Sequence, residues 1–91
     1  MCGFAGFLDR TKSGVAFEGS LQKMGNALRH RGPDDSGHFS LYEEGLGLVH
    51  QRLSIIDLSL MGRQPMKSGC GRYLTTYNGE IYNYVELRQQ L

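Results

Sequence analysis

The sequence predicts an α+β fold in which helices pack on a largely antiparallel sheet. Three observations predict it: apolar runs of strand length recur along the chain, two segments carry apolar residues at helical spacing, and the strand-like segments have short connections. With 91 residues, the chain can form one domain at most, with a small core. The expected order is strand, helix, strand, strand, strand, helix.

The first half of the chain predicts a strand, a helix and a loop. Residues 4–8 are apolar and include two phenylalanines, which indicates a buried strand close to the N-terminus. Over residues 17–29 the apolar positions recur every three or four residues, as in an amphipathic helix that packs one face on a sheet. Residues 30–37 concentrate Gly, Pro, Asp and Ser, so they predict a structured loop.

The middle of the chain predicts a hairpin followed by a loop. Residues 38–42 and 46–50 are strand-like, and only residues 43–45 separate them, which favours antiparallel pairing. Residues 52–58 are apolar but lead into a polar, glycine-containing connection, so we predict a loop with local order.

The C-terminal part predicts one more strand and one more helix. Residues 73–77 are rich in Tyr and Thr, which favour strands, and residues 84–91 place Leu87 and Leu91 four apart, as a helix requires. No glycine cap closes this helical pattern. The helical pattern therefore runs to the last residue of the sequence.

Charge and composition exclude several function classes. The formal net charge is +1 and 21% of the residues are charged, which lacks the basic excess of a nucleic-acid-binding protein. The N-terminus has no basic region followed by a long apolar stretch, so neither a signal peptide nor a membrane helix is expected. A cytoplasmic location follows as the expectation.

The cysteines and histidines predict neither a disulfide nor a metal site. Cys2 and Cys70 are expected to stay reduced, because the chain carries no export signal. The three histidines lack metal-ligand spacing with either cysteine. No phosphate-binding or dinucleotide glycine motif is present, so no cofactor is expected in this segment.

Cys2 is the candidate nucleophile. Removal of Met1 would leave a thiol and a free α-amine on one residue. An α-amine titrates at roughly 7.7 to 8.0, so it can accept the thiol proton, as in N-terminal nucleophiles. Small Gly3 would leave the approach open. The alternative is a chance cysteine at an uninformative terminus, but the apolar strand directly after Cys2 favours the nucleophile.

Two further segments carry candidate site residues. Asn78 and Gly79 lie between a strand and a helix, where an amide side chain and a backbone N–H can form an oxyanion hole; Asn-Gly is also a turn dipeptide, and the interpretations are compatible. Arg52 can hold a carboxylate in bidentate fashion, or lie at the surface with its stem packed down. Glu80 can pair with a substrate ammonium or cap the following helix.

Four motifs together carry a family resemblance. They are MCGFAG at 1–6, HRGPDDSG at 30–37, HQRLSIID at 50–57 and NGEIYNY at 78–84. In this order they resemble the class II glutamine amidotransferase domain of glutamine-hydrolysing asparagine synthetases. The resemblance implies an Ntn-hydrolase fold, a four-layer α-β-β-α sandwich, of which residues 1–91 would be the N-terminal part.

The resemblance also implies roles for individual residues. Cys2 would attack the glutamine amide, and Asn78 with Gly79 would form the oxyanion hole. Arg52 would bind the α-carboxylate, and Glu80 would contact the α-amino end together with an aspartate further along the chain. Backbone groups would assist Arg52; they belong to Leu53, Ser54, Ile55 and Ile56.

For the whole protein, the resemblance implies glutamine hydrolysis that supplies ammonia to a separate synthetase domain. That domain would use ATP and Mg to amidate aspartate or a related acid. Glutamine is the expected partner, without nucleic acid or membrane, and the chain is expected to form a homo-oligomer or to pack against the rest of its protein. The alternative is a catalytically incomplete fragment that keeps the fold signature and only self-associates or binds a partner.

Overall fold

The computed structural model describes residues 2–11, 14–54 and 62–91. Its elements, in chain order, are β1 (Gly3–Leu8), α1 (Gly14–Leu28), the 3-10 turn η1 (Arg29–Arg31), β2 (Asp35–Leu41), the 3-10 turn η2 (Tyr42–Glu44), β3 (Leu46–Arg52), β4 (Met66–Lys67), β5 (Leu74–Thr75) and α2 (Tyr84–Gln90).

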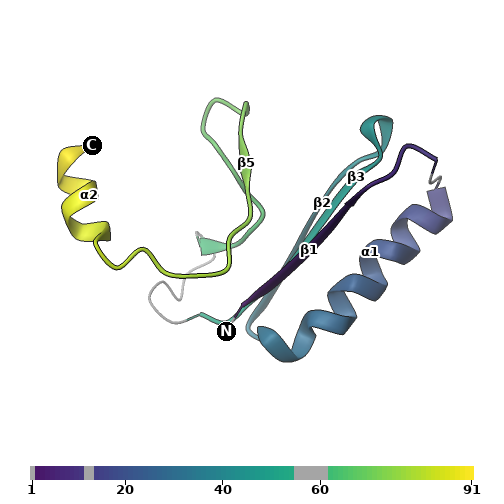
Figure 1. The fold of residues 1–91 in the computed structure, drawn as a ribbon, viewed down its shortest axis with the longest axis horizontal. Coiled ribbons are helices and arrows are strands. Elements are labelled where there is room, and N and C mark those ends of the chain that lie inside the picture. Colours follow the sequence, from purple (N-terminus) through teal and green to yellow (C-terminus); the bar gives the residue numbers. More distant parts are fainter. Residues whose placement is uncertain (1, 12–13, 55–61) are drawn as a thin grey trace.

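A three-stranded antiparallel sheet forms the body of the molecule, with β3 in the centre between β1 and β2. Helix α1 runs along one face of this sheet, and the β4–β5 hairpin lies on the other side, with α2 beyond it (Figure 1). Because β3 is hydrogen-bonded on both edges, it is the most firmly held strand of the sheet.

The core lies between α1 and the sheet. Phe17 and Leu21 from α1 and Val49 from β3 are buried. The rings of Phe7 and Phe17 meet edge to face, with centroids 5.0 Å apart. Gly47 allows the close contact, since a Cβ there would lie 2.7 Å from the Phe7 ring. The apolar face predicted for the helix thus packs as expected.

The opposite face of β3 is apolar over Leu46 and Leu48 and becomes polar only at its end. Side chains alternate along a strand, so His50 and Arg52 point away from the face that carries Val49. Both are buried, with 1% and 7% of their surface exposed. The hairpin lies over this face: the Lys67 ammonium lies 5.6 Å from the Phe39 ring centroid. At the His50–Arg52 end of β3 the two layers therefore meet over buried polar and charged side chains, and a site can form there.

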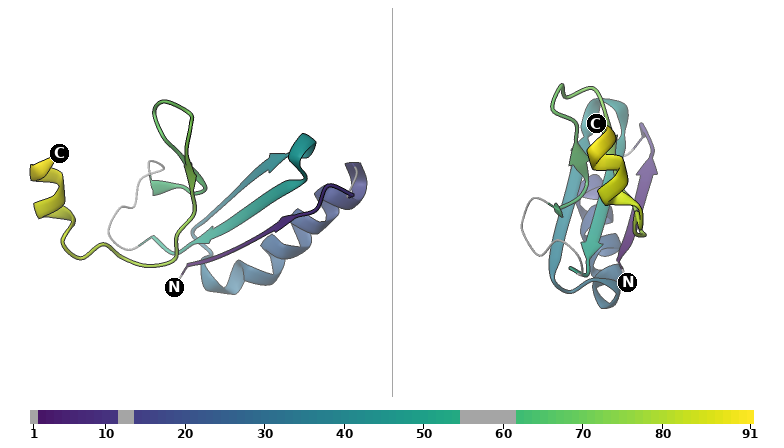
Figure 2. Two further views of the ribbon diagram at one scale, coloured as in Figure 1. Left: turned by 45° about the horizontal axis from the view of Figure 1, so that its top comes forward. Right: turned by 90° about the vertical axis from the view of Figure 1, so that its left-hand side faces the viewer.

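Helix α2 stands apart from the sheet (Figure 2). None of its residues is buried, although Tyr84, Val85 and Leu87 are large and apolar. No helix within the described parts of the chain has the length and apolar character needed to span a membrane.

Most predicted elements are confirmed, with four corrections. The loop predicted at 30–37 ends early, because residues 35–37 already pair with the end of β3 and belong to β2. The strand predicted at 4–8 exists, but the prediction that it is buried is wrong: Phe4 is 46% and Leu8 71% exposed. The strand predicted at 73–77 covers only Leu74–Thr75. The predicted order also lacked β4, because a two-residue strand leaves no alternation to detect.

Candidate active site

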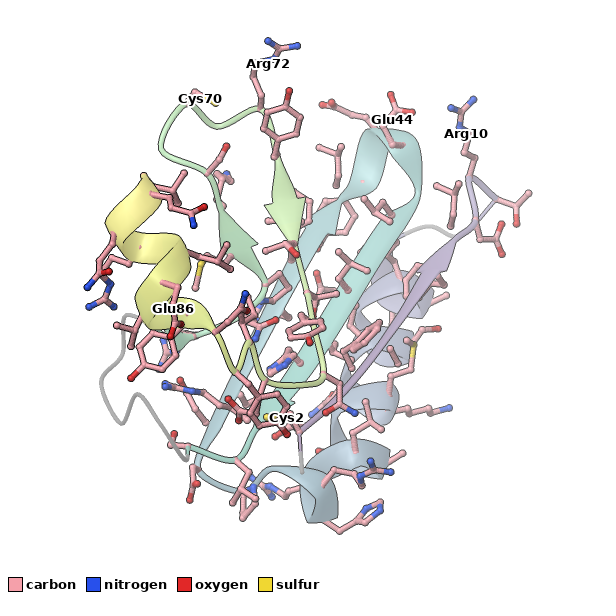
Figure 3. All side chains as sticks on the ribbon, turned by 60° about the vertical axis from the view of Figure 1, so that its left-hand side comes forward. Cys2, Arg10, Glu44, Cys70, Arg72 and Glu86 are labelled. Atoms are coloured by element: carbon pink, nitrogen blue, oxygen red, sulfur yellow. The ribbon has the colours of Figure 1, made fainter. Side chains whose placement is uncertain are left out.

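The Cys2 thiol is held at the end of β3. Its Sγ accepts a hydrogen bond from the Leu53 backbone N–H at 3.3 Å and lies 3.6 Å from the Leu53 carbonyl oxygen. Cys2 is half-buried and lies where the end of the sheet meets the segment before α2 (Figure 3). An N–H donor at this distance is placed to hold the sulfur when it carries negative charge.

A cavity of about 320 Å³ opens beside this thiol. Five residues predicted for the site line it: Cys2, Arg52, Leu53, Gly79 and Glu80. The rest of the lining comes from the 62–66 segment and from residues around the start of α2; these are Gly62, Gln64, Met66, Tyr77, Ile81 and Tyr84. The volume suits a small metabolite.

Arg52 is the last residue of β3 and is almost fully buried. The interpretation of Arg52 as a surface side chain is therefore wrong. Asp35 of β2 lies opposite Arg52 in the sheet register. Arg52 and Glu80 give the cavity lining one cation and one carboxylate, the pair of charges that a free amino acid would meet.

The other residues predicted for the site are not among the described residues that line the cavity. Asn78 is half-buried and is not among the residues lining the cavity. The Ser54 backbone N–H donates to Asp34 Oδ2 at 2.7 Å and is already in use within the fold. Ile55 and Ile56 lie outside the described residues.

The loop before β2 supports the Arg52 end of β3. Gly32 lets the loop approach, since a Cβ there would lie 2.5 Å from Arg52 backbone atoms. The Asp34 backbone N–H donates to the Arg52 carbonyl at 3.0 Å, and its carboxylate accepts from Ser54. Asp34 was not predicted as a site residue. Its place in the motif at residues 30–37 is the sequence feature that could have pointed to it.

The segment that carries Gly79 is held through Tyr77. The Tyr77 carbonyl oxygen lies 3.2 Å from His50 Nε2. The Tyr77 backbone N–H donates a hydrogen bond to Gln64 Oε1 at 2.6 Å. Gly79 lies against the Tyr77 phenol, where a Cβ would come within 2.6 Å of the hydroxyl oxygen. Burial lowers the pKa of His50. Neither His50 nor Gln64 was predicted, because each contacts main chain distant in sequence.

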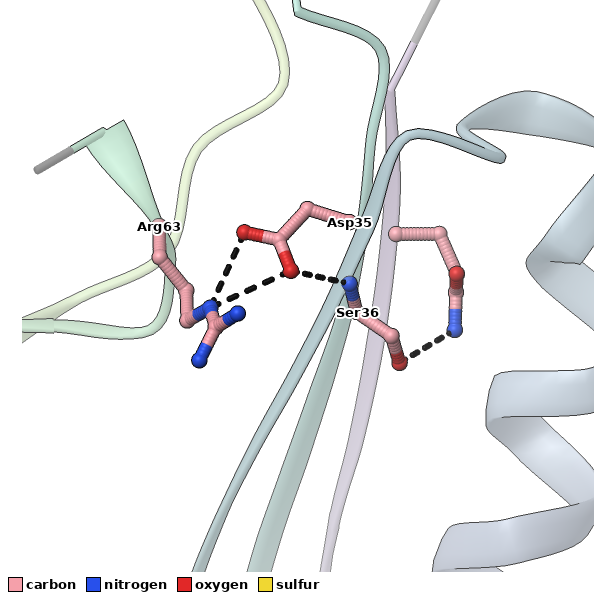
Figure 4. Close-up of polar contacts among 4 residues, drawn as sticks. Asp35, Ser36 and Arg63 are labelled. Atoms are coloured by element: carbon pink, nitrogen blue, oxygen red, sulfur yellow. Dashed lines mark hydrogen bonds and ion pairs between the residues drawn. The ribbon is translucent and has the colours of Figure 1, made fainter. Parts of the chain in front are cut away.

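An ion pair fastens the cavity wall to the sheet. Arg63 Nε lies 2.9 Å from Asp35 Oδ2 and 3.1 Å from Oδ1 (Figure 4). The Ser36 N–H donates to the same carboxylate at 2.9 Å. The hydrogen bond from Arg63 is the main cause that lowers the pKa of Asp35. Gly37 lies beside this pair: a Cβ there would lie only 1.8 Å from the Gln64 carbonyl oxygen.

This ion pair predicts an acid-dependent loss of stability. The pKa of Asp35 is lower in the folded chain than its ordinary 3.8, so the pair contributes fully above that value and its contribution disappears as pH falls through the folded pKa. We expect Asp35→Asn to lower the free energy of unfolding at pH 7, and the gap from wild type to close as the pH falls below 3.8 and through the folded pKa of Asp35. Urea denaturation at several pH values measures it.

The exposed pair Arg10–Glu44, with N and O 2.9 Å apart, is the matched control. Glu44→Gln should change stability little at any pH, since exposed ion pairs contribute little. A gap between wild type and Asp35→Asn that stays constant from pH 7 to pH 2 would contradict the assignment.

Metal ligation has no support within residues 2–11, 14–54 and 62–91: no group of three or more His, Cys, Asp or Glu side chains is placed to hold an ion. Cys2 and Cys70 are free thiols, the first half-buried and the second exposed. The cavity lining itself offers the Cys2 thiol, the Arg52 guanidinium, the Glu80 carboxylate, the Gln64 amide and tyrosine side chains.

Comparison with known proteins identifies the family of the chain. Residues 1–91 match a family described as the glutamine amidotransferase domain. The chain is 40% identical to the glutamine-hydrolyzing asparagine synthetase 1 of Bacillus subtilis, and 41% identical to asparagine synthetase 1 of Arabidopsis thaliana and to the asparagine synthetase of Brassica oleracea. All of this chain is covered in each match, but it spans only 14% to 15% of the length of these relatives.

Proposed function

The chain belongs to the glutamine amidotransferase domain family, and from this premise we propose that it hydrolyses the side-chain amide of glutamine, with Cys2 as nucleophile once Met1 is removed. The observation that carries the proposal is the position of the Cys2 thiol in the wall of a cavity shared with Arg52 and Glu80. A thiol, a cation and a carboxylate around one small cavity fit an amino acid with a reactive amide.

The proposed reaction has two steps. The free α-amine of Cys2 takes the thiol proton, and the thiolate attacks the amide carbon of glutamine. The oxyanion that forms is stabilised by Gly79 N–H and the Asn78 side chain. The C–N bond then breaks, the amine returns its proton to the leaving nitrogen, and ammonia departs. Water hydrolyses the resulting thioester, which releases glutamate and restores the thiol.

Arg52 and Glu80 are proposed to bind the two charged groups of the substrate. Arg52 would pair with the α-carboxylate, and Glu80 with the α-ammonium. The pairing is supported by the position of both residues in the lining of one cavity. The backbone of Leu53 and of the three residues after it would assist Arg52, and an aspartate further along the natural protein would assist Glu80.

The relatives suggest what becomes of the ammonia. Their names describe glutamine-hydrolyzing asparagine synthetases. We therefore propose that this chain is the front part of a glutaminase domain in a longer cytoplasmic protein, whose synthetase domain uses ATP and Mg to amidate aspartate or a related acid. The uncovered apolar side chains of α2 would then pack against the remainder or a second copy.

A second candidate is a non-catalytic fragment that binds a partner through the same fold. Two observations favour it for residues 1–91 taken alone: α2 has no buried residue, and Asn78 does not line the cavity. A glutaminase assay separates the candidates, because a binding module releases no glutamate after Met1 is removed.

Covalent labelling tests the proposed nucleophile. A glutamine-shaped chloroketone should modify Cys2 one-to-one in the natural protein freed of Met1, and added glutamine should slow the labelling, because both occupy the same cavity. Peptide mapping by mass spectrometry identifies the modified residue.

Cys70 provides the control for this experiment. It is exposed, and the Ser68 hydroxyl that hydrogen-bonds to it lowers the pKa of its thiol. A small alkylating agent without glutamine character should therefore modify Cys70 readily. If the glutamine-shaped reagent prefers Cys70, or still labels a Cys2→Ala protein to the same extent, Cys2 is not the nucleophile.

A further inference from the structure

We propose that His50 is a positioning residue for the reaction: it holds the peptide group that leads into Asn78 and Gly79, and so presets the oxyanion-binding segment opposite Cys2. This inference rests on the proposed function, since it assigns His50 a task in that chemistry. Nothing requires His50 to touch glutamine, because it is not among the residues that line the cavity.

His50 is a rigid anchor. It lies in the central strand, opposite Phe4 of β1 and Gly37 of β2, and only 1% of its surface is exposed. A side chain on a strand paired at both edges moves less than one on a loop. Arg52 lies two residues further along the same strand, so it shares the sheet face with His50.

The hydrogen bond of His50 fixes its tautomer. Its Nε2 lies 3.2 Å from the Tyr77 carbonyl oxygen, and a carbonyl can only accept, so Nε2 must carry the hydrogen. Its Nδ1 is buried and has no partner among the described residues. A proton on Nδ1 would place a charge there without an acceptor, so the neutral Nε2–H form is the one that fits.

Charged neighbours do not change this assignment. The charges that act on the ring come from Arg52 on its own strand and Asp35 on β2, and they oppose one another. Burial is the larger influence and favours the neutral ring. His50 therefore acts as a fixed hydrogen-bond donor at neutral pH.

The contact is transmitted to the oxyanion segment through a planar peptide. The Tyr77 carbonyl and the Asn78 N–H belong to one peptide unit, so fixing the carbonyl fixes the direction of that N–H. The peptide between Thr76 and Tyr77 is also held, because Gln64 Oε1 accepts a hydrogen bond from the Tyr77 N–H at 2.6 Å. With both peptide groups of Tyr77 held, the backbone that enters Asn78 and Gly79 has little freedom to rotate.

A preset oxyanion segment speeds the chemical step without tightening substrate binding. The charge that Gly79 and Asn78 would stabilise develops only in the transition state, so misplacing them raises the barrier to catalysis. A merely structural histidine would have a different signature, because variants that fold equally well would then be equally active. The kcat and KM values of matched variants can therefore decide between the two roles.

The test compares His50→Phe with His50→Gln in the natural full-length protein freed of Met1. Phenylalanine fills the space without a donor, whereas glutamine places an N–H near the position of Nε2. We expect His50→Phe to lower kcat for glutamine hydrolysis about 10- to 100-fold with KM within about threefold, since small misplacements cost that much. His50→Gln should recover most of kcat.

Several results would overturn the inference. They are an unchanged kcat in a folded His50→Phe protein, a loss confined to KM, or a His50→Gln protein as slow as His50→Phe at equal thermal stability. Cys2→Ala is assayed in parallel: if it still hydrolyses glutamine, the proposed function fails, whereas an inactive Cys2→Ala beside an unchanged His50→Phe removes only the role of His50.

A second measurement does not depend on folding of the variants. Nitrogen NMR of histidine-labelled wild-type protein at pH 7 reports which ring nitrogen carries the hydrogen. The neutral Nε2–H form of His50 is expected. A neutral Nδ1–H form or an imidazolium would overturn the proposal, because neither matches a donor at Nε2 beside a buried, unpartnered Nδ1.

Discussion

Replacing Cys2 with alanine is expected to lower kcat for glutamine hydrolysis at least ~10³-fold, since removal of a covalent nucleophile costs this much or more. No other thiol lines the cavity within the described part of the chain, because Cys70 is an exposed residue in the connection between β4 and β5. Cys2 is half-buried and precedes β1, so the folded structure should survive the change. Glutamate release by the natural protein measures the effect.

The controls separate loss of the nucleophile from general damage. Cys70→Ala should keep kcat within about twofold of wild type, because Cys70 touches nothing in the cavity. Added ammonium should bypass the defect of Cys2→Ala in any synthetase reaction of the natural protein. Substantial glutamine hydrolysis by a folded Cys2→Ala protein would contradict the assignment.

Blocking the α-amine of Cys2 should be about as damaging. With one leucine inserted between Met1 and Cys2, the thiol remains but its amine becomes a peptide nitrogen, which cannot act as a base. Loss of a general base lowers rates about 10²- to 10⁴-fold. We expect a fall in kcat of that size at unchanged thermal stability, with the N-terminus verified by mass spectrometry.

Freeing the blocked α-amine of Cys2 gives a more decisive test than blocking it. A leader that a site-specific protease removes directly before Cys2 should give an inactive protein that gains full activity on cleavage. A protein that hydrolyses glutamine equally well before and after cleavage would show that the α-amine is not the base. Cleavage of the same leader from a Cys2→Ala protein controls for the protease.

The sequence predicted the elements whose patterns are local. The apolar spacing around Phe17 and Leu21 predicted α1, and the short connection at 43–45 predicted the β2–β3 hairpin. Burial of β1 was predicted wrongly, because an apolar run does not show how many layers will cover it. The two-residue strand β4 depends on its pairing with β5 and carries no pattern of its own.

The site likewise contains residues that the sequence predicted and residues that it did not. Motif resemblance selected Cys2, Arg52, Gly79 and Glu80, and the fold brings them to one cavity. The residues that hold them were missed, because the supporting contacts join positions far apart: Asp34 to Ser54 across 20 residues and His50 to Tyr77 across 27. Such contacts use backbone atoms, which every residue possesses, so no residue type marks them.

The contact between Cys2 and Leu53, across 51 residues, also sets an order of events during synthesis. A ribosome releases the N-terminus first, and β1 has no partner strand until residues 46–52 have followed it. Throughout that interval the first residues are an open substrate for the cellular aminopeptidase that trims methionine. On the proposed function, removal of Met1 would therefore come before the pocket closes around the thiol, and folding would not compete with it.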